Sequence, residues 1–346
     1  MSTIDHTFDP GAAAGTDSGI FGLPDRPEDA AVVLVPVPFD ATTSYRPGTA
    51  DGPRAILAAS HQIDLHDHET GEPWSSGIAM LAEPTEVRAW SVAARAAAEP
   101  VMHDPDCGDA AQRIAEVDAI CERLNRHLET EVSRWLEAGK VVGTVGGDHG
   151  TTFGAIAAHA RRHPGLGVLH IDAHADLRAA YQGFAWSHAS IMENVVRRVP
   201  EVGRLVQVGV RDFCTEEVER IEASGGRIRT WFDADLARER FEGATWGAQV
   251  TAIVDALPRE VYVSFDIDGL SPDLCPHTGT PVPGGLGFNE ASHLIGAVAR
   301  SGRRIVGFEL VEVAPGPDGD EWDANVGARM LYKLIGWALR SRAPAG

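Results

Sequence analysis

Short apolar runs alternate with amphipathic segments along most of this chain of 346 residues. Runs dominated by apolar residues are typical of strands that are buried on both faces of a parallel sheet. They lie at residues 141–145, 167–171, 261–264 and 305–310. Residues 109–139 instead space their apolar side chains by three or four, which predicts an amphipathic helical segment, with an internal break as an open alternative. Gly139 would end this segment just before the next strand.

The alternation of strand and helix patterns favours one large α/β domain. With 44% hydrophobic residues the chain can bury a large core, and neither a linker nor an internal repeat divides it. Residues 1–28 are rich in Gly, Ala, Asp and Pro, and we predict that they form a flexible or oligomer-contacting arm. The single domain would then span residues 29–346.

Clustered metal-ligand chemistry follows three of the apolar runs, at residues 146–150, 172–176 and 264–269. In an extended chain the side chains at i, i+2 and i+4 point to the same side, so Asp172, His174 and Asp176 should converge. The carboxyl ends of parallel strands form the edge where α/β proteins bind ligands. The chain would therefore bring two histidines and four carboxylates to one edge of the sheet.

Carboxylates packed this closely raise one another's pKa and repel one another unless cations neutralise them. Two divalent ions that share bridging carboxylates can use six such ligands, and a centre of this kind activates a water molecule. The alternative interpretation is that the aspartates cap helices or form turns. Three clusters after three strands favour the metal centre over that alternative.

At these residues the chain resembles the ureohydrolase family, which includes arginase and agmatinase. The family's signatures are a Gly-Gly-Asp-His turn, an Asp-Ala-His-x-Asp segment and a Ser-Phe-Asp-x-Asp-x-x-x-Pro segment, and all three occur here in order. The resemblance extends from about Val33 to the region of Leu339 and includes the Gly-Pro loop at residues 44–53. It implies a three-layer α/β/α fold with a central, mostly parallel eight-stranded sheet, which the zinc deacetylases share.

The resemblance also implies a ligand set. One ion would be held by His149, Asp172, Asp176 and Asp266, and the other by Asp172, His174, Asp266 and Asp268. Asp172 and Asp266 would then bridge the two ions. Manganese is the metal that the family suggests, and the ligand types are also compatible with nickel or cobalt.

The implied reaction is hydrolysis of a guanidino carbon, which releases urea and an amine. Besides Asp176, which would stabilise the tetrahedral intermediate, two further residues match catalytic positions of the family. His188 would shuttle a proton to the leaving amine, for which an unperturbed pKa of about 6.5 is suitable. Glu312 follows the run at 305–310 and would pair with the guanidinium, whose planar shape a carboxylate matches. A helix-capping histidine and a solvated glutamate are the alternative interpretations.

The substrate is a harder question, since the chain departs from arginase at two positions. Arg178 and Cys214 replace the asparagine and aspartate with which arginase contacts the substrate's α-carboxylate and α-amino group. Agmatine has no carboxylate, so we predict conversion of agmatine to putrescine. Arg178 leaves a second option open, a guanidino acid such as guanidinobutyrate or guanidinopropionate, or a formimidoyl compound. Residues 80–110, with Trp90 and Met102, and residues 181–184 are expected to supply the loops that select the substrate tail.

Charge and composition indicate which ligands and which cellular location to expect. The formal net charge is −20, which argues against nucleic-acid binding and would attract a cationic substrate. No apolar stretch reaches about 18 residues, and the four cysteines have no paired spacing, so we expect a soluble cytoplasmic protein that contacts no membrane. Relatives form trimers and hexamers, which implies a homo-oligomer.

The sequence also raises two other possibilities, a further metal site and a subunit without catalytic activity. His61, His66 and His68 invite a further metal site, but no partner cluster completes a coordination shell, and the alternation of Asp64, His66 and His68 indicates an exposed strand face. A non-enzyme alternative is a silent subunit of a mixed ureohydrolase oligomer. The intact ligand set argues against it, because clustered carboxylates are costly to retain without a function.

Overall fold

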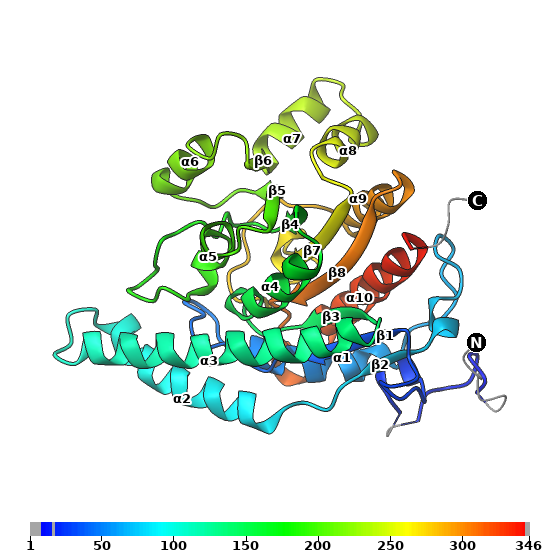
Figure 1. Ribbon diagram of the computed structural model, residues 1–346, viewed down its shortest axis with the longest axis horizontal. Helices are drawn as coiled ribbons and strands as arrows, with labels where there is room; N and C mark the ends of the chain where they lie inside the picture. The colour runs from blue at the N-terminus through cyan, green and yellow to red at the C-terminus, as the bar shows by residue number, and fades with distance from the viewer. Residues whose placement is uncertain (1–7, 16–17, 343–346) are drawn as a thin grey trace.

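An eight-stranded sheet forms the centre of the molecule (Figure 1). The computed structural model describes residues 8–15 and 18–342. All neighbouring strands pair in parallel, in the order β2-β1-β3-β8-β7-β4-β5-β6. The strands are β1 (Val32–Pro36), β2 (Ile78–Met80), β3 (Val141–Val145), β4 (Leu166–Ile171), β5 (Val202–Val210), β6 (Ile228–Phe232), β7 (Glu260–Asp266) and β8 (Arg304–Val311). The four runs predicted from the sequence are thus confirmed as β3, β4, β7 and β8.

Helices cover both faces of the sheet and give three layers. They are α1 (Gly52–Ser60), α2 (Thr85–His103), α3 (Ala110–Glu137), α4 (Phe153–Arg162), α5 (Ile191–Arg198), α6 (Thr215–Glu222), α7 (Asp233–Phe241), α8 (Trp246–Asp255), α9 (Phe288–Arg300) and α10 (Trp322–Arg340). Val32 and Leu34 share a core with α1, α9 and α10, whereas Val33 and Val35 share one with α2 and α3. This alternation follows from the two-residue period of a strand, and it confirms the predicted α/β/α architecture.

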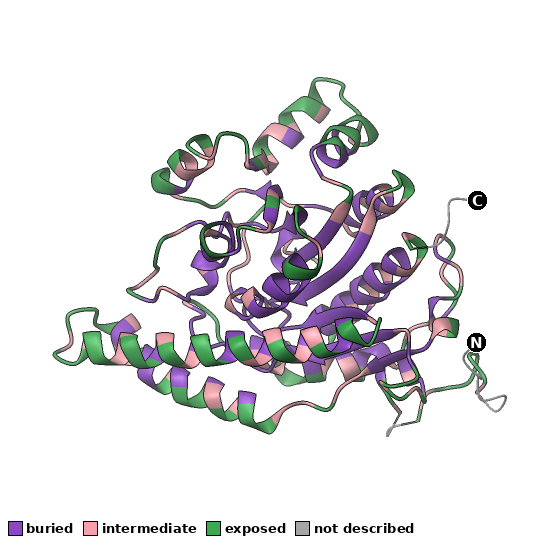
Figure 2. Cartoon of the chain, in the orientation of Figure 1, coloured by how far each residue is buried: buried purple, intermediate pink, exposed green. Residues whose placement is uncertain are grey.

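The segment after residue 109 forms one continuous helix, α3, without a break. Its apolar stripe packs on α2 and α4, and it includes Val117, Leu124 and Leu128, each of which is almost completely buried. Gly139 follows the helix with a φ of 79°, a left-handed conformation that glycine adopts without strain. Figure 2 shows the burial of the central strands between the helical layers.

Two expectations about local structure were wrong. The stretch around His66 and His68 is not a strand: it forms turns, closed by an isolated bridge between Asp67 and Gly71. Most of residues 80–110 are helical, and Trp90 and Met102 pack with the core between α2 and α3 instead of forming a loop. The alternation of Asp64, His66 and His68 therefore did not indicate a strand, because the neighbouring chain turns here, where the backbone nitrogen and hydroxyl of Thr70 both donate to Asp67 Oδ1.

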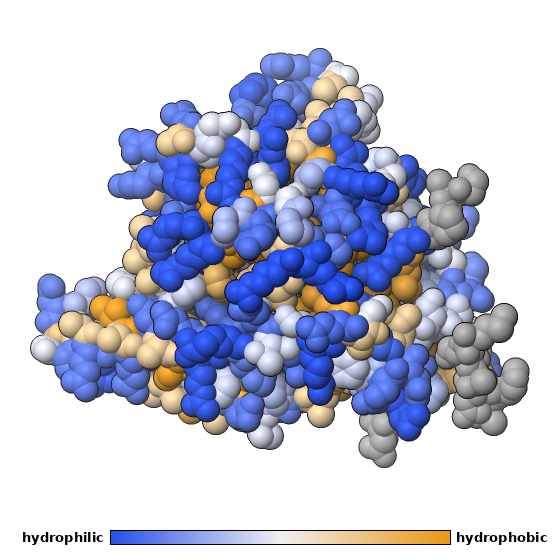
Figure 3. All heavy atoms as spheres, in the orientation of Figure 1, coloured by the Kyte–Doolittle hydropathy of each residue, from blue (hydrophilic) through white to orange (hydrophobic). Residues whose placement is uncertain are grey.

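The described part of the N-terminal region contacts the core. Ile20, Phe21 and Leu23 are almost completely buried, and the Phe21 ring lies 4.9 Å from that of Tyr332. Residues 1–7 and 16–17 of the predicted arm lie outside the described residues, and the boundary at residue 28 stays a prediction. Within the described chain, no helix is both long and apolar enough to cross a lipid bilayer. Polar residues predominate on the face shown in Figure 3.

Candidate metal centre

Four neighbouring strands in the middle of the sheet, β3, β8, β7 and β4, end at the same edge, and the predicted polar clusters follow three of them. His149 lies in a short 3-10 helix just after β3, Asp172 follows β4 directly, and Asp266 ends β7. The sheet thus brings together residues that are more than one hundred positions apart in the sequence. This is the arrangement that the spacing of the motifs predicts.

Three carboxylates converge on one imidazole nitrogen. His149 Nδ1 lies 2.9 Å from Asp172 Oδ2, 3.1 Å from Asp176 Oδ2 and 3.3 Å from Asp266 Oδ2. All four side chains are at most 4% exposed. Such a set of one nitrogen and three oxygens can surround a divalent cation.

A second group adjoins the first and shares Asp172 with it. His174 Nδ1 lies 3.1 Å from Asp268 Oδ2 and 3.4 Å from Asp172 Oδ1. Asp172 therefore turns one oxygen toward each histidine, as a carboxylate that bridges two cations would. Asp268 is buried, while His174 keeps part of its ring open to solvent.

The electrostatics of the cluster favour cations. Burial, together with Asp268 and Asp172, raises the pKa of Asp266 well above its ordinary value. Burial and Asp172 likewise raise the pKa of Asp176. Buried carboxylates of this kind resist ionisation unless positive charge is supplied nearby. Consistent with this, His149 Nδ1 and Asp268 Oδ2 are buried and have no hydrogen-bond partner among the described residues.

A buried chain of hydrogen bonds sets the tautomer of His149. Tyr262 and Ser264 each donate a hydroxyl to Glu309, at 2.6 Å. The Ser264 Oγ lies 2.9 Å from His149 Nε2, and since its own proton goes to Glu309, it must accept one from His149. The lone pair of the imidazole is therefore left on Nδ1, which faces the three aspartates.

A second chain supports Asp172. Thr230 donates to Gln207 Oε1 at 2.8 Å, and the amide nitrogen of Gln207 donates to the Ala175 carbonyl and to His170 Nδ1, at 2.7 and 3.0 Å. His170 must then carry its proton on Nε2, which lies 2.7 Å from Asp172 Oδ2. The hydrogen bonds of Gln207 thus orient the carboxylate that joins the two groups.

Two residues of the site have strained backbones. Asp176 and Glu312 have φ values of 55° and 62°, in the left-handed region that residues other than glycine seldom adopt. Strain of this kind is held in place by surrounding contacts and is concentrated at functional sites. In Glu312, Oε1 accepts a hydrogen bond of 2.9 Å from the His149 backbone nitrogen, whereas Oε2 is buried without a partner among the described residues.

A cavity of about 230 Å³ opens beside the cluster. His174, Asp176 and His188 are among the residues that line it. The remaining lining residues are Ser44, Tyr45, Arg178, Tyr181, Ala189, Asp212, Glu217, Thr280, Pro281 and Val282. His174 and Asp176 of the cluster are thus the members that line this small opening, together with charged and aromatic residues.

Comparison with known proteins agrees with this geometry. The model of the arginase family matches residues 30–336. The chain belongs to the arginase family. The N(1)-aminopropylagmatine ureohydrolase of Thermus thermophilus is 34% identical over 92% of this chain and 94% of its own length. The agmatinase of Sodalis glossinidius is 31% identical over 97% of both chains. The solved agmatine ureohydrolase of Thermoplasma volcanium has the same fold, with a TM-score of 0.72, 24% identity, and 93% and 94% of the two chains covered.

This arginase-family chain is therefore a ureohydrolase, an enzyme that acts on guanidino carbon–nitrogen bonds. The family depends on a binuclear metal centre, and the His and Asp cluster at the edge of the sheet is the part of the described chain that fits one. The predicted residues His149, Asp172, His174, Asp176, Asp266 and Asp268 all meet there.

The other predicted site residues lie around this cluster. His188 is buried, with Nδ1 3.5 Å from Thr42 Oγ1 and Nε2 3.5 Å from Ser44 Oγ. Burial, followed by His174 and His149, lowers the pKa of His188 to about 3, below its unperturbed value. Arg178 lines the cavity, with its Nε 3.8 Å from Glu217 Oε2 and its guanidinium 5.0 Å from the Tyr181 ring.

Sequence reasoning missed His170, Gln207 and Glu309, all fully buried in the sheet. A signal existed for His170, which stands two residues before Asp172 and so points to the same side. No comparable signal existed for the other two, which are single polar residues within apolar strands. His61, His66 and His68 take no part in the site: His61 lies against the Gly19 carbonyl, and the other two are exposed.

Proposed function

We propose that the chain uses two divalent metal ions to release urea from a guanidino substrate with a cationic tail, of which agmatine is the simplest. The observation that carries this proposal is the charge around the cavity. Asp212 lines it and forms no ion pair with a described residue, and the single lining arginine, Arg178, faces the carboxylate of Glu217. The mouth therefore keeps an excess of negative charge, which attracts an ammonium group.

The donor set fits a pair of ions. We assign His149, Asp172, Asp176 and Asp266 to one ion and Asp172, His174, Asp266 and Asp268 to the other, with manganese as the proposed metal and nickel or cobalt as alternatives. Two buried atoms support this assignment. His149 Nδ1 and Asp268 Oδ2 have no hydrogen-bond partner among the described residues, and a bound ion would satisfy both. When bound, the ions supply an activated water and positive charge at the reacting carbon.

The remaining chemistry falls to side chains of this chain. Glu312 Oε2 has an unused acceptor position, and we propose that it binds the planar guanidinium while the His149 amide holds Oε1 in place. Asp176 belongs to both the cluster and the cavity wall, so it can take a proton from the attacking water. His188 lines the same cavity, and we propose that its ring relays a proton to the leaving amine.

Two observations favour particular alternatives for the tail. The Thermus thermophilus relative acts, by its name, on N(1)-aminopropylagmatine, whose tail is longer and carries an additional amine. Such a tail would extend toward the exposed Asp212 and Tyr45 at the mouth. Arg178, in contrast, lines the cavity, where it could bind the carboxylate of a guanidino acid. Guanidinobutyrate and guanidinopropionate are therefore the second class of candidate substrates.

A substrate panel tests the proposal. Manganese-loaded protein would be assayed for urea release from agmatine, N(1)-aminopropylagmatine, arginine, guanidinobutyrate and guanidinopropionate. We expect the two amines to exceed the acids by at least about tenfold in kcat/KM, since an ionic contact contributes more than about 1.4 kcal/mol. A preference for the acids that Arg178→Ala removes would overturn the cationic assignment. The proposed homo-oligomer can be checked on the same sample by sedimentation.

A further inference from the structure

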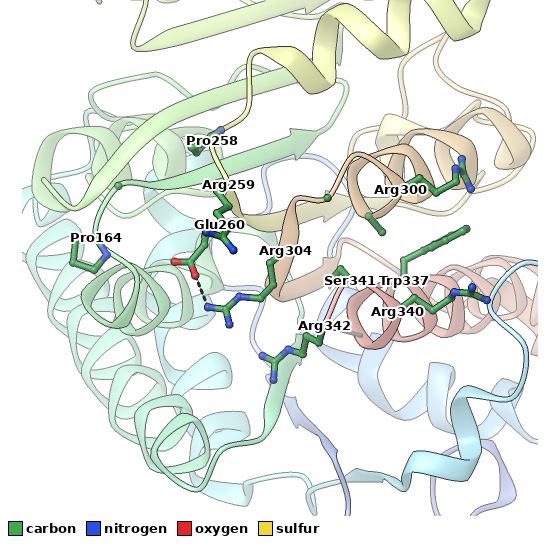
Figure 4. Close-up of a pocket in the computed structure, with 13 residues that line it drawn as sticks. Pro164, Pro258, Arg259, Glu260, Arg300, Arg304, Trp337, Arg340, Ser341 and Arg342 are labelled. Carbon is green, nitrogen blue, oxygen red and sulfur yellow. Dashed lines mark hydrogen bonds and ion pairs between the residues drawn. The ribbon is translucent and has the colours of Figure 1, made fainter. Parts of the chain in front are cut away.

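A second charged cavity lies at the opposite edge of the sheet, where the strands begin. Its volume is about 1360 Å³, and it is open to solvent (Figure 4). It lies between the segments that lead into β4, β7 and β8 and the end of α10. None of its lining residues belongs to the candidate metal centre.

Arginine dominates this cavity, which we call the arginine pocket. It is lined by Arg259, Arg300, Arg304, Arg340 and Arg342, and Glu260 is the one acidic lining residue among those that the structure describes. Glu260 is shared, because it pairs with Arg304 and also lies 2.9 Å from His163 Nδ1. This concentration of positive charge stands out on a chain whose formal net charge is −20.

Neighbouring groups hold two of the arginines at the rim of the pocket. The guanidinium of Arg300 lies 4.8 Å from the centre of the Trp337 ring, and Arg340 donates to the Glu69 carbonyl at 3.1 Å. These contacts fix the two side chains without neutralising them fully, since the nearest acid, Glu69 Oε1, is 3.7 Å from Arg300. Arginine held in this way loses little conformational freedom when it binds an anion.

The centre of the pocket has the least compensated charge. Among the described residues, the Arg259 side chain forms no hydrogen bond or ion pair, and the Arg342 side chain donates only to the Val306 carbonyl, at 3.3 Å. Partial burial, followed by Arg304 and Arg162, lowers the pKa of Arg342. Mutual repulsion of this kind is relieved when an anion enters.

We propose that the arginine pocket binds a small, multiply charged phosphate anion. Several guanidinium forks around a hollow suit the oxygens of linked phosphate groups, which can each accept paired hydrogen bonds. The concave shape and the acidic remainder of the protein favour a small ligand over a long nucleic acid, whose flanking phosphates would meet negative charge. The inference is independent of the proposed guanidino chemistry, because it concerns the other edge of the sheet.

Calorimetry with sodium tripolyphosphate, inorganic phosphate and citrate tests the proposal on the full chain. The variant Arg259→Gln/Arg342→Gln removes the two least compensated charges. Its matched control is Arg126→Gln/Arg197→Gln, which changes the net charge equally at exposed positions outside the pocket. Tripolyphosphate also chelates manganese, but both double variants retain the same metal centre, so their difference isolates the pocket.

We expect saturable tripolyphosphate binding that weakens at least about tenfold in the pocket variant and stays unchanged in the control. Arg259→Gln alone, which removes no side-chain hydrogen bond or ion pair among the described residues, provides the test if the double variant does not fold. Equal weakening in both double variants, or no binding by the unaltered protein, would overturn the proposal. Citrate binding of equal strength would overturn the phosphate assignment. A changed oligomeric mass of the pocket variant without anion binding would instead identify this face as a contact between copies of the chain.

Discussion

The two edges of the central sheet are opposite in charge and in exposure. At the carboxyl edge, the carboxylates of Asp172, Asp266 and Asp268 are buried at 1–2% exposure. At the amino edge, arginines surround an open cavity. Buried like charges need counterions for the fold to tolerate them, whereas exposed ones are partly screened by solvent. The first edge therefore requires its ligands for function and stability, and the second can bind or release a ligand without such a cost.

Removing metal should affect the carboxyl edge most strongly. Chelation with subsequent dialysis is expected to lower urea release at least about a thousandfold, because the activating charge is lost. The melting temperature should fall as well, since the carboxylates would be left unneutralised. Urea release and thermal unfolding before and after adding manganese would check this. Full activity in verified metal-free protein would contradict the proposed centre.

Glu312→Gln separates substrate binding from metal binding. Loss of the charge that we propose pairs with the guanidinium should lower kcat/KM about a hundredfold, while the metal content per chain stays the same. Steady-state kinetics and elemental analysis of the same preparation measure both. If the variant loses metal in proportion to activity, Glu312 belongs to the metal centre and not to a guanidinium site.

His159 packs on the middle of the sheet, between the two edges, and should make the stability of the fold depend on pH. It is buried on α4 against Tyr262, and burial lowers its pKa from 6.5 to about 4. The unfolded chain binds more protons than the native one in this window, so stability decreases as the pH falls from 6.5 toward 4. The loss should be about 2 kcal/mol between pH 7 and pH 5. Chemical denaturation at both pH values should show a smaller loss for His159→Gln, and an identical loss in both proteins would exclude His159 as the cause.

Gln207→Leu tests the hydrogen-bond chain behind Asp172. Without the Gln207 amide, the His170 proton is no longer held on the nitrogen that faces Asp172, and metal affinity should fall about tenfold. Gln249→Leu is the matched control, since Gln249 is also buried but bonds to the Leu236 carbonyl. Competition with a chelator of known affinity gives the measurement. Equal affinities in the two variants would show that Gln207 has only a packing role.

The smallest effect is expected from the amino edge. A strand of seven residues such as β7 spans roughly 20 Å, which exceeds the screening length of about 8 Å in physiological salt. Arg259→Gln/Arg342→Gln should therefore change agmatine kinetics less than about twofold. A large change in KM with unchanged folding would show that the two edges are coupled.

The contrast between the edges also explains what the sequence could predict. Asp172, His174 and Asp176 are two residues apart after an apolar run, so strand geometry alone indicates that they converge. The arginines of the pocket come from segments as distant as Arg259 and Arg342, with no spacing that links them. Their proximity is a consequence of the tertiary fold. The placement of Arg178 against Glu217 and Tyr181 depends in the same way on packing that no local pattern encodes.

We propose that the carboxyl edge of the sheet holds two metal ions and hydrolyses guanidino compounds. Urea release from agmatine during stepwise addition of manganese to metal-free protein tests this claim most directly. We expect activity to rise until two equivalents of metal per chain are bound and then to stay constant. A plateau at one equivalent, or metal binding without urea release from any guanidino compound, would contradict it.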